Sequence, residues 1–169
     1  MDQNSLSRTD RDITAIYDRQ VETVYRVCFS MTGNRYDAED AVQTVFVKLM
    51  GWSQTGEFND YAHEKAWLIT TARNVCRDLH RQWWRRKVSG LETLGEAEAC
   101  QDDSCASHEV WEKLMALDLK YRTLLYLYYY EEYKIHEISA MLGLNENTVK
   151  TRLRAARKKL KLEMGEDFV

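Results

Sequence analysis

The chain has 169 residues, with 24 Lys or Arg against 27 Asp or Glu and a formal net charge of −3 at pH 7. It contains no proline, and strand-like alternation is scarce, so the sequence predicts an all-α fold in one domain or two small ones. The first residues lack the basic and apolar parts of a signal peptide, and no apolar run is long enough to cross a membrane. We therefore expect a cytoplasmic protein that does not insert into a membrane.

A first helical block is expected over residues 9–87. Apolar residues spaced as on one helix face predict a long first helix, which Gly33-Asn34 interrupts. Asp37 is predicted to cap a second helix, with Asp40 three residues later as in a capping box. Residues 51–62 are expected to form a loop before a third helix. The apolar positions that support these helices include Ile13, Ile16, Val24, Cys28, Ala41, Val42, Val45, Phe46, Leu49, Trp67, Leu68, Ala72, Val75 and Leu79.

Charge is distributed unevenly along the chain. Basic residues gather at 73–87 and 150–161, whereas residues 88–112 hold seven acids and no Lys or Arg. Local fields rather than net charge determine how a protein meets phosphate, so the net charge does not exclude a DNA-binding protein. Residues 88–107 also lack apolar periodicity, and we expect them to form an acidic linker that is flexible or partly helical.

The second helical block is expected over residues 108–164 and ends in a helix-turn-helix. Gly143 ends the first helix of this motif, because glycine adopts the left-handed turn without steric cost. Asn145 is predicted to cap the second helix. The inward faces of the two helices are Ile135, Ile138, Met141 and Leu142, then Val149, Leu153, Ala156 and Leu160.

The second helix of the motif is strongly basic, with seven Lys or Arg and no acid from Lys150 to Lys161. A helix with a polar N-terminal half and this cationic load is typical of a recognition helix in the DNA major groove. The alternative is a solvated amphipathic helix whose basic residues complement the helix dipole. We expect DNA binding, because the turn, the core spacing and the charge agree.

The four cysteines are Cys28, Cys76, Cys100 and Cys105, and they do not form a disulfide framework in a cytosolic chain. Cys76 and His80 are an i, i+4 pair that could present two ligands on one helix face, with the last two cysteines completing a zinc site. No CxxC spacing supports this site, and Cys28 and Cys76 are more simply small core residues. The sequence predicts no metal and no cofactor.

Three sets of residues, two in the first block and one in the second, together resemble a known protein family. The first block holds Asp37-Ala38-Glu39-Asp40-Ala41-Val42-Gln43-Thr44-Val45-Phe46, and later Glu64-Lys65-Ala66-Trp67-Leu68, Ala72-Arg73-Asn74 and Asp78. The second block holds Tyr121-Arg122, Tyr128-Tyr129-Tyr130 and the stretch from Glu137 to Leu160. In order, these resemble the core-polymerase-binding helix, the promoter-melting segment and the C-terminal domain of sigma-70-type factors. Their order and spacing are similar to those of the small extracytoplasmic-function (ECF) sigma factors, which keep only domains two and four.

The resemblance implies a transcription initiation factor, not an enzyme, that binds core RNA polymerase and directs it to promoters by −35/−10 recognition and promoter melting. It implies a region 2-like domain over residues 9–87 for core binding and −10 recognition, and a region 4-like domain over 108–164 for −35 recognition. The implied partners are the clamp helices of the largest polymerase subunit, the polymerase flap, promoter DNA and an anti-sigma factor. Melting needs no covalent chemistry, since aromatic platforms and a positive track can hold the opened strand.

The resemblance also assigns candidate residues to each surface. The polymerase-binding candidates are Asp37, Glu39, Asp40 and Gln43, for which helix capping and solvation are the alternative roles. The −10 candidates are Phe58, Tyr61, Arg73, Asn74, Arg77, Arg81, Trp84, Arg85 and Arg86, with a base-capturing loop over roughly residues 54–64. The −35 candidates are Asn147, Lys150, Thr151, Arg152, Arg154, Arg157 and Lys158. Ala155 replaces a larger or basic residue of many relatives, so the −35 sequence is not carried over.

The aromatic residues have different expected environments. Trp67 and Trp83 follow the apolar stripe of the third helix, whereas Trp84 points elsewhere and is the better exposed candidate. The Tyr128-Tyr129-Tyr130 run is expected to be mostly core of the second block, with at most part of it facing the polymerase flap. Exposure of each ring therefore decides which of them can stack on a base.

Two other functions stay open on the sequence. An ordinary helix-turn-helix repressor or activator would bind duplex DNA without polymerase, but it leaves the basic, aromatic end of the third helix unexplained. A metal-dependent nuclease lacks its usual signals, because the sequence shows no carboxylate cluster, no HxxxH and no glycine-rich phosphate loop. We expect no enzymatic activity.

Overall fold

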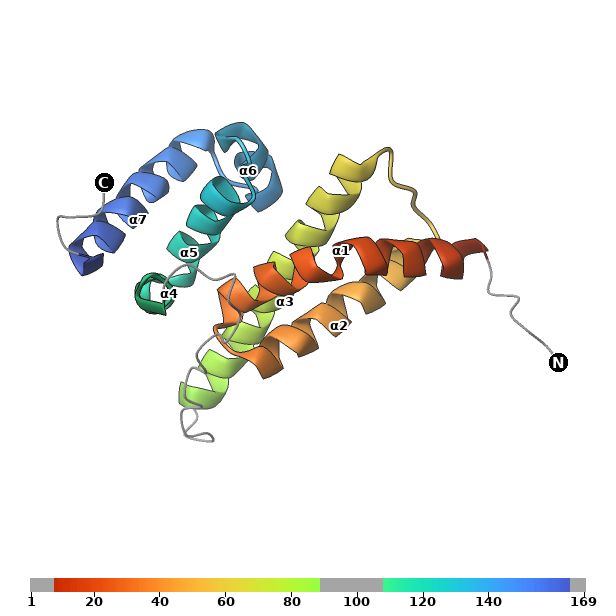
Figure 1. Ribbon diagram of the computed structural model, residues 1–169, viewed down its shortest axis with the longest axis horizontal. Coiled ribbons are helices and arrows are strands. Elements are labelled where there is room, and N and C mark those ends of the chain that lie inside the picture. The colour runs from red at the N-terminus through yellow and green to blue at the C-terminus, as the bar shows by residue number, and fades with distance from the viewer. Residues whose placement is uncertain (1–7, 89–107, 165–169) are drawn as a thin grey trace. The chain divides into compact units, whose positions relative to one another are not determined.

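The computed structural model describes residues 8–88 and 108–164, which fall into two compact units (Figure 1). The first unit consists of α1 (Arg8–Thr32), α2 (Arg35–Trp52) and α3 (Tyr61–Val88). The second consists of α4 (His108–Ala116), α5 (Leu119–Leu125), the π-helical η1 (Tyr126–Tyr130), α6 (Ile135–Leu142) and α7 (Glu146–Met164). Every regular element within the described ranges is helical, which confirms the all-α prediction. Most of the expected linker lies outside these ranges.

The first unit is a three-helix bundle in which each helix contacts the other two. α1 and α2 form an antiparallel hairpin, and α3 packs against both (Figure 1). Apolar side chains at helical spacing supply the inner faces, and full burial of each large one contributes about 1.5–3 kcal/mol. The most deeply buried positions include Val24, Val27 and Cys28 of α1, Ala41, Val45 and Leu49 of α2, and Leu68, Ile69 and Ala72 of α3.

The turn between α1 and α2 depends on Gly33 and Asn34. Gly33 has a left-handed φ of 75°, and its N–H donates to the Phe29 carbonyl at 2.9 Å. Asn34 is the N-cap of α2, since its Oδ1 accepts from the Asp37 N–H at 2.8 Å. The prediction that Asp37 caps this helix is wrong. Asn34 already provides a capping oxygen directly after the glycine, so α2 begins at Arg35 and Asp37 lies in its first turn.

The connection between α2 and α3 spans residues 53–60, which is shorter than the predicted loop because both helices extend further. Phe58 stacks on Trp52 with ring centroids 4.2 Å apart, and Trp52 lies 5.3 Å from Trp67. Gly56 closes on the same rings, because a Cβ there would meet two Trp52 ring carbons at 2.5 Å. Each aromatic pair contributes about 0.5–1.5 kcal/mol beyond its burial, so these contacts tie the loop to both helices.

In the second unit α7 contacts α4, α5 and α6 and supplies one whole face of the core. Three of the inward positions predicted for this helix are fully buried, and Leu160 near its end is half-buried. The buried apolar positions of the unit are Leu117, Leu124, Leu125, Tyr126, Leu127, Ile138, Val149, Leu153 and Ala156. The periodicity of the sequence therefore identified the buried side of α7.

The η1 segment winds more widely than an α-helix. The Glu131 N–H donates to the Tyr126 carbonyl five residues back, at 3.1 Å. Glu132 then has a left-handed φ of 57°, which for a residue with a side chain costs about 1–2 kcal/mol. At the end of η1, Tyr129 and Tyr130 are 57% and 51% exposed. The prediction that the three-tyrosine run is mostly core is wrong, because consecutive residues of a helix point in different directions and three of them cannot share one buried face.

The turn of the helix-turn-helix follows its prediction. Gly143 has a left-handed φ of 61° and ends α6, and the Leu144 N–H donates to the Ser139 carbonyl at 3.0 Å. Asn145 caps α7, because its Oδ1 accepts from the Asn147 N–H at 2.8 Å. The glycine stop and the asparagine cap are both confirmed.

Alanine at Gly143 is expected to destabilise the second unit by about 1–2 kcal/mol, because a Cβ strains the left-handed backbone. Alanine at Gly51 is expected to stabilise the first unit by up to about 1 kcal/mol, since this glycine is helical and its Cβ would meet nothing within 4 Å. Thermal unfolding followed by circular dichroism measures both shifts in the full chain. A Gly143→Ala variant as stable as the parent would contradict the assigned turn, and a destabilised Gly51→Ala variant would contradict the open helical position of Gly51.

Candidate functional site

The outer face of α7 carries side chains suited to contact with base edges. After the exposed Glu146, its first exposed residues are Asn147, Lys150, Thr151 and Arg154. The Thr151 hydroxyl donates to the Asn147 carbonyl at 2.8 Å. Lys150 Nζ lies 3.8 Å from a Glu146 carboxylate oxygen, an exposed contact worth about 0–1 kcal/mol. Arg154 makes no hydrogen bond or ion pair within the part of the chain that the structure describes, so its guanidinium is available to a ligand.

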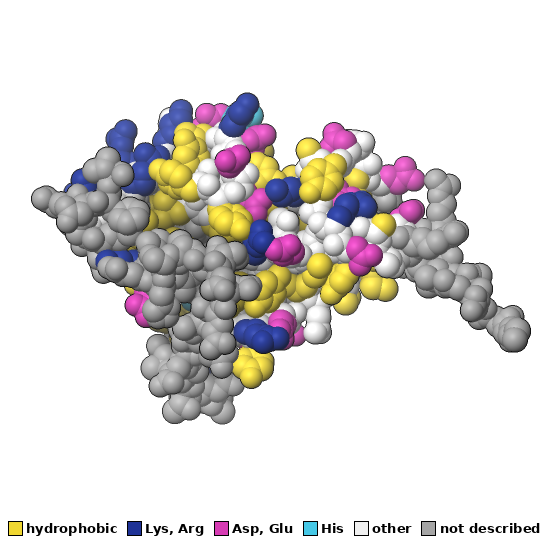
Figure 2. Space-filling view, in the orientation of Figure 1, with side chains coloured by type: hydrophobic (Ala, Val, Ile, Leu, Met, Phe, Trp, Pro, Cys, Tyr) yellow, Lys and Arg dark blue, Asp and Glu magenta, His cyan; other side chains and the backbone are white. Residues whose placement is uncertain are grey.

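Basic side chains further along α7 extend the same surface. Figure 2 shows Lys and Arg side chains gathered over this helix. The Arg157 guanidinium carbon lies 5.9 Å from the ring centroids of both Tyr128 and Tyr129, a cation–π arrangement worth about 0.5–1 kcal/mol at an exposed site. Arg152 is half-buried and Lys158 is exposed. The tyrosines therefore restrict Arg157, while Lys158 extends into solvent.

One face of α3 carries a row of cations. Arg73, Arg77 and Arg81 recur every fourth residue and therefore share one side of the helix. Burial lowers the pKa of Arg73, and the positive charge of Arg77 lowers it further. Arg73 Nη1 donates to Asn74 Oδ1 at 3.0 Å, and Arg77 Nε lies 3.5 Å from Asp78 Oδ1. A polyanion beside this row would relieve the repulsion between its arginines.

The three candidate aromatic platforms of the first unit differ in exposure. Tyr61 and Trp84 are 57% and 55% exposed. Phe58 is half-buried among Trp52 and Trp67, so it supports the loop instead of presenting an open ring face. Trp67 is half-buried in the same cluster. The exposed cations nearest Trp84 in the sequence are Arg81, Arg85 and Arg86.

The outer face of α2 carries the four predicted polymerase-binding residues. Asp37, Glu39, Asp40 and Gln43 are all exposed. Glu39 Oε1 accepts from Arg35 Nε at 2.7 Å. Asp37 Oδ2 accepts from Asn34 Nδ2 at 2.6 Å. The Asp40 and Gln43 side chains make no hydrogen bond or ion pair with described residues, so they are the two most available for a partner.

The same face has an apolar stripe that sequence reasoning missed. Tyr36, Val47 and Met50 are 73%, 65% and 50% exposed. Together with Asp40 and Gln43 they alternate between spacings of four and three residues, so all five share one side of α2. We call this set the α2 stripe. Exposed large apolar side chains in line with polar ones are typical of a protein-binding helix face, and this spacing was the signal available in the sequence.

The two described cysteines lie in the core of the first unit, which confirms that prediction. Cys28 and Cys76 are 0% and 2% exposed, and a side-chain hydrogen bond with Cys76 together with burial raises the pKa of the Cys28 thiol. Reactive thiolates need the opposite shift. Cys100 and Cys105 lie outside the described residues. Within those residues no group of His, Cys, Asp or Glu is arranged to hold a metal, and none of the helices could cross a membrane.

Comparison with known proteins matches both units. The family described as Sigma-70 region 2 matches residues 16–86, and the family described as Sigma-70, region 4 matches residues 107–160. The ECF RNA polymerase sigma factor SigL of Mycobacterium tuberculosis is 30% identical over 158 residues, which cover 90% of this chain and 88% of SigL. This chain belongs to the ECF sigma factors of the sigma-70 family.

Other proteins are similar to this ECF sigma factor in sequence or fold. The RNA polymerase sigma factor SigV of Bacillus subtilis is 28% identical over 155 residues, covering 92% of each chain. The sigma factor RpoE, solved in complex with the anti-sigma factor NepR from Bartonella quintana, has a TM-score of 0.76 and 21% identity, covering 94% of this chain and 99% of RpoE. CnrH, solved in complex with the cytosolic domain of CnrY, has a TM-score of 0.64 and 22% identity, covering 94% and 90%. At these identities the two structures show a shared fold.

As an ECF sigma factor the protein is a transcription initiation factor that directs RNA polymerase to promoters. The family is one of initiation factors and is not a known enzyme family. The α2 stripe and the arginine row of α3 lie within the region 2 match, and the outer face of α7 lies within the region 4 match. Within the described residues the sigma factor therefore has a cationic helix face in each region, exposed on α7 and half-buried at Arg73 and Arg77 on α3.

Proposed function

We propose that the outer face of α7 recognises the −35 element in the DNA major groove. The capped start of this helix presents Lys150 and Thr151, and Arg154 can offer two parallel donors to guanine O6 and N7. Asn147 would assist at the first turn. Arg152, Arg157 and Lys158 would contact phosphates, with Arg157 pre-ordered by two tyrosine rings. Each good base contact discriminates by about 1–3 kcal/mol.

We propose that α3 and the loop before it bind the −10 element and hold its opened strand. Arg73, Arg77 and Arg81 form a positive track along one side of the helix, and Arg85 and Arg86 extend it. Asn74 adds a neutral amide that can hydrogen-bond beside this track. Tyr61 and Trp84 supply exposed rings on which unstacked bases can stack, at about 1–3 kcal/mol per base. Such stacking offsets the few kcal/mol that unpairing costs. Phe58 would keep the loop 53–60 in place through its contacts with Trp52 and Trp67.

We propose that the α2 stripe binds core RNA polymerase through the clamp helices of its largest subunit. Asp40 and Gln43 can bond to basic and polar groups of a partner. Val47 and Met50 add apolar area beside them. A stripe that combines both kinds of contact suits a helix docked along another helical surface. The polymerase flap would bind the second unit, where Tyr129 and Tyr130 are exposed.

We further propose a cytoplasmic location and an anti-sigma partner. The similar sigma factor RpoE was solved with the anti-sigma factor NepR, and the similar protein CnrH was solved with the cytosolic domain of CnrY. Exposed apolar side chains such as those of the α2 stripe are surfaces that a protein inhibitor can cover. The proposed domains are residues 9–87 and 108–164, with 88–107 as the linker.

One observation carries the proposal: each unit has a cationic helix face, which on α3 consists of the half-buried Arg73 and Arg77 and the exposed Arg81, and Trp84, three residues after Arg81, is exposed. The test is single-round transcription with purified core RNA polymerase, with and without the protein, on genomic fragments. We expect protein-dependent transcripts whose starts share one −35/−10 pair. If core polymerase is not retargeted while the protein alone shifts duplex DNA, the ordinary helix-turn-helix regulator is the correct function.

Replacing Trp84 with alanine is expected to lower open-complex formation about tenfold, because one base loses its stacking surface. Trp84→Phe keeps a ring at the same position and is expected to retain most of the activity. The effect is measured from the fluorescence of a 2-aminopurine inserted in the −10 region, which reports when that base unstacks. If the alanine variant opens the promoter as well as the parent does, Trp84 is not part of the proposed DNA-binding surface.

A further inference from the structure

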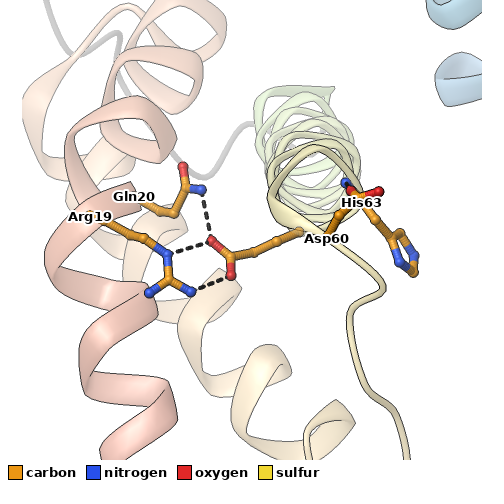
Figure 3. A network of polar contacts seen from close by, with 5 residues as sticks. Arg19, Gln20, Asp60 and His63 are labelled. Atoms are coloured by element: carbon orange, nitrogen blue, oxygen red, sulfur yellow. Dashed lines mark hydrogen bonds and ion pairs between the residues drawn. The ribbon is translucent and has the colours of Figure 1, made fainter.

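A buried polar network joins α1 to the first turn of α3. Glu64 is 4% exposed, and its carboxylate accepts from Arg19 Nε at 2.9 Å and from Gln20 Nε2 at 2.8 Å (Figure 3). Arg19 Nη2 also forms an ion pair with the second carboxylate oxygen. Burial raises the pKa of Glu64, but the hydrogen bonds from Arg19 and Gln20 outweigh it, so the net pKa lies below its ordinary value. The carboxylate is therefore ionised inside the unit.

An ionised group in this place adds little net stability. Taking charges out of water costs several kcal/mol per ion, and well-packed apolar residues of similar volume often stabilise a fold as well. The inner face of α3 already has such residues directly after this turn, at Leu68 and Ile69. What this ion pair between a buried carboxylate and a half-exposed arginine adds is direction, because the hydrogen bonds to the carboxylate are satisfied in one geometry only. The network therefore specifies how the start of α3 is set against α1.

The segment held in this way leads directly into the loop 53–60. Glu64 donates its backbone N–H to the Asp60 carbonyl at 3.1 Å. Asp60 Oδ1 accepts from the His63 N–H at 2.7 Å, and His63 Nδ1 accepts from the Asn59 N–H at 3.2 Å. Tyr61, with its exposed ring, lies in the same turn as Glu64. Fixing Glu64 against α1 thus fixes the ring and the end of the loop together.

We propose that Glu64 is a positioning residue for promoter opening. Its bonds to Arg19 and Gln20 hold Tyr61 and the loop 53–60 in the geometry that receives the unstacked −10 strand. This inference rests on the proposed function of that surface. Glu64 is buried and acts through the turn that it anchors, without contact to DNA.

The direction of the effect separates positioning from plain electrostatics. Removing a carboxylate from a DNA-binding domain makes it more positive, and that change alone strengthens DNA binding. Positioning predicts the opposite, because Glu64→Gln removes the ion pair with Arg19 and one of the two acceptor oxygens through which α1 holds the start of α3. Asp18→Asn is the matched control, since it removes the same charge from an exposed α1 residue that lies next to Arg19 in the sequence.

The experiment uses the full chain with core RNA polymerase and two templates, a duplex promoter and the same promoter with its −10 region held open by mismatches. Glu64→Gln is expected to lower the rate of duplex opening about tenfold. An effect of this size lies within the range of interaction energies found between residues of one hydrogen-bond network. The loss is expected to be much smaller on the pre-opened template, where no strand separation is needed. Arg19→Gln, on a half-exposed partner, should show the same pattern. The double variant should be no worse than the poorer single variant.

Core binding by competition and thermal unfolding are measured on the same variants. Parent-level opening by both single variants would overturn the proposal. An equal loss on both templates, or loss of core binding or of folding in both variants, would overturn it too, because the network would then be a general stability element. If the parent itself gives no core-dependent transcript on either template, the proposed function fails instead, whatever the variants do.

Discussion

An Arg154→Ala variant is expected to lose transcription from promoters that depend on the −35 element, while its binding to core RNA polymerase stays at the parent level. Arg154 is exposed and unpaired within the described residues, and it lies on the face of α7 that follows the Asn145 cap. A lost bidentate contact costs about 1–3 kcal/mol, which corresponds to roughly five- to 150-fold in affinity. Binding of the polymerase complex to a promoter duplex, with single-base changes across the −35 element, measures the loss base by base.

Lys158→Ala provides the comparison for that result. Lys158 is also exposed on α7, but it lies one turn beyond Arg154 and is proposed to contact phosphate. Its loss is expected to weaken all sequences equally and to reduce the slope of log K against log salt by about 1. Arg154→Ala should instead relax the preference at one base pair. If both variants weaken every sequence equally, Arg154 contacts the backbone and not a base.

The helix-turn-helix could be predicted closely because its signals are local. Gly143 ends α6 through its left-handed backbone conformation. Asn145 begins α7 through a hydrogen bond from the N–H of Asn147, two residues later. The buried side of α7 follows from a helical period that nothing interrupts. Exposure of Arg154 and Lys150 then follows, since they occupy the opposite side. Local rules suffice where one element is regular and its cap is unambiguous.

The errors occurred where two local rules compete. Asn34 and Asp37 are both good capping residues, and only the observed backbone shows that the earlier one is used. In the tyrosine run, three large rings favour burial, but three consecutive helical residues cannot share one buried face, and the run winds as the π-helical η1. Tyr129 and Tyr130 are accordingly exposed, against the expectation that the run is mostly core.

The polar network of Glu64 could not be predicted, because its partners are distant in the chain. Arg19 and Glu64 are separated by 45 residues, and each alone is an ordinary charged residue on a helix. The half-buried position of Phe58 likewise needs Trp52 and Trp67 to come together around the loop. These contacts form only when the three helices have packed together, so no residue pattern along a single helix predicts them.

An Asp40→Lys variant is expected to lose most of its affinity for core RNA polymerase, and with it transcription from every promoter. Asp40 is exposed in the middle of the α2 stripe, and its carboxylate has no partner among the described residues. A hydrogen bond to a charged group contributes about 1.5–3 kcal/mol, so its loss alone weakens binding about tenfold to 150-fold. Repulsion from a basic partner would add to this. Competition against a labelled parent protein for core polymerase measures the change.

Asp18→Lys tests whether charge alone explains such a loss. It makes the same reversal on an exposed residue of α1, outside the α2 stripe, and is expected to bind core polymerase as the parent does. Met50→Ala should weaken binding with little dependence on salt, because it removes apolar contact and no charge, whereas the Asp40→Lys defect should shrink as salt rises. Equal losses in the two lysine variants would show that net charge governs the interaction. If only the Asp40 and Met50 variants lose affinity for core polymerase, the α2 stripe is the binding surface, since the side of α2 on which they lie is all that these two residues share.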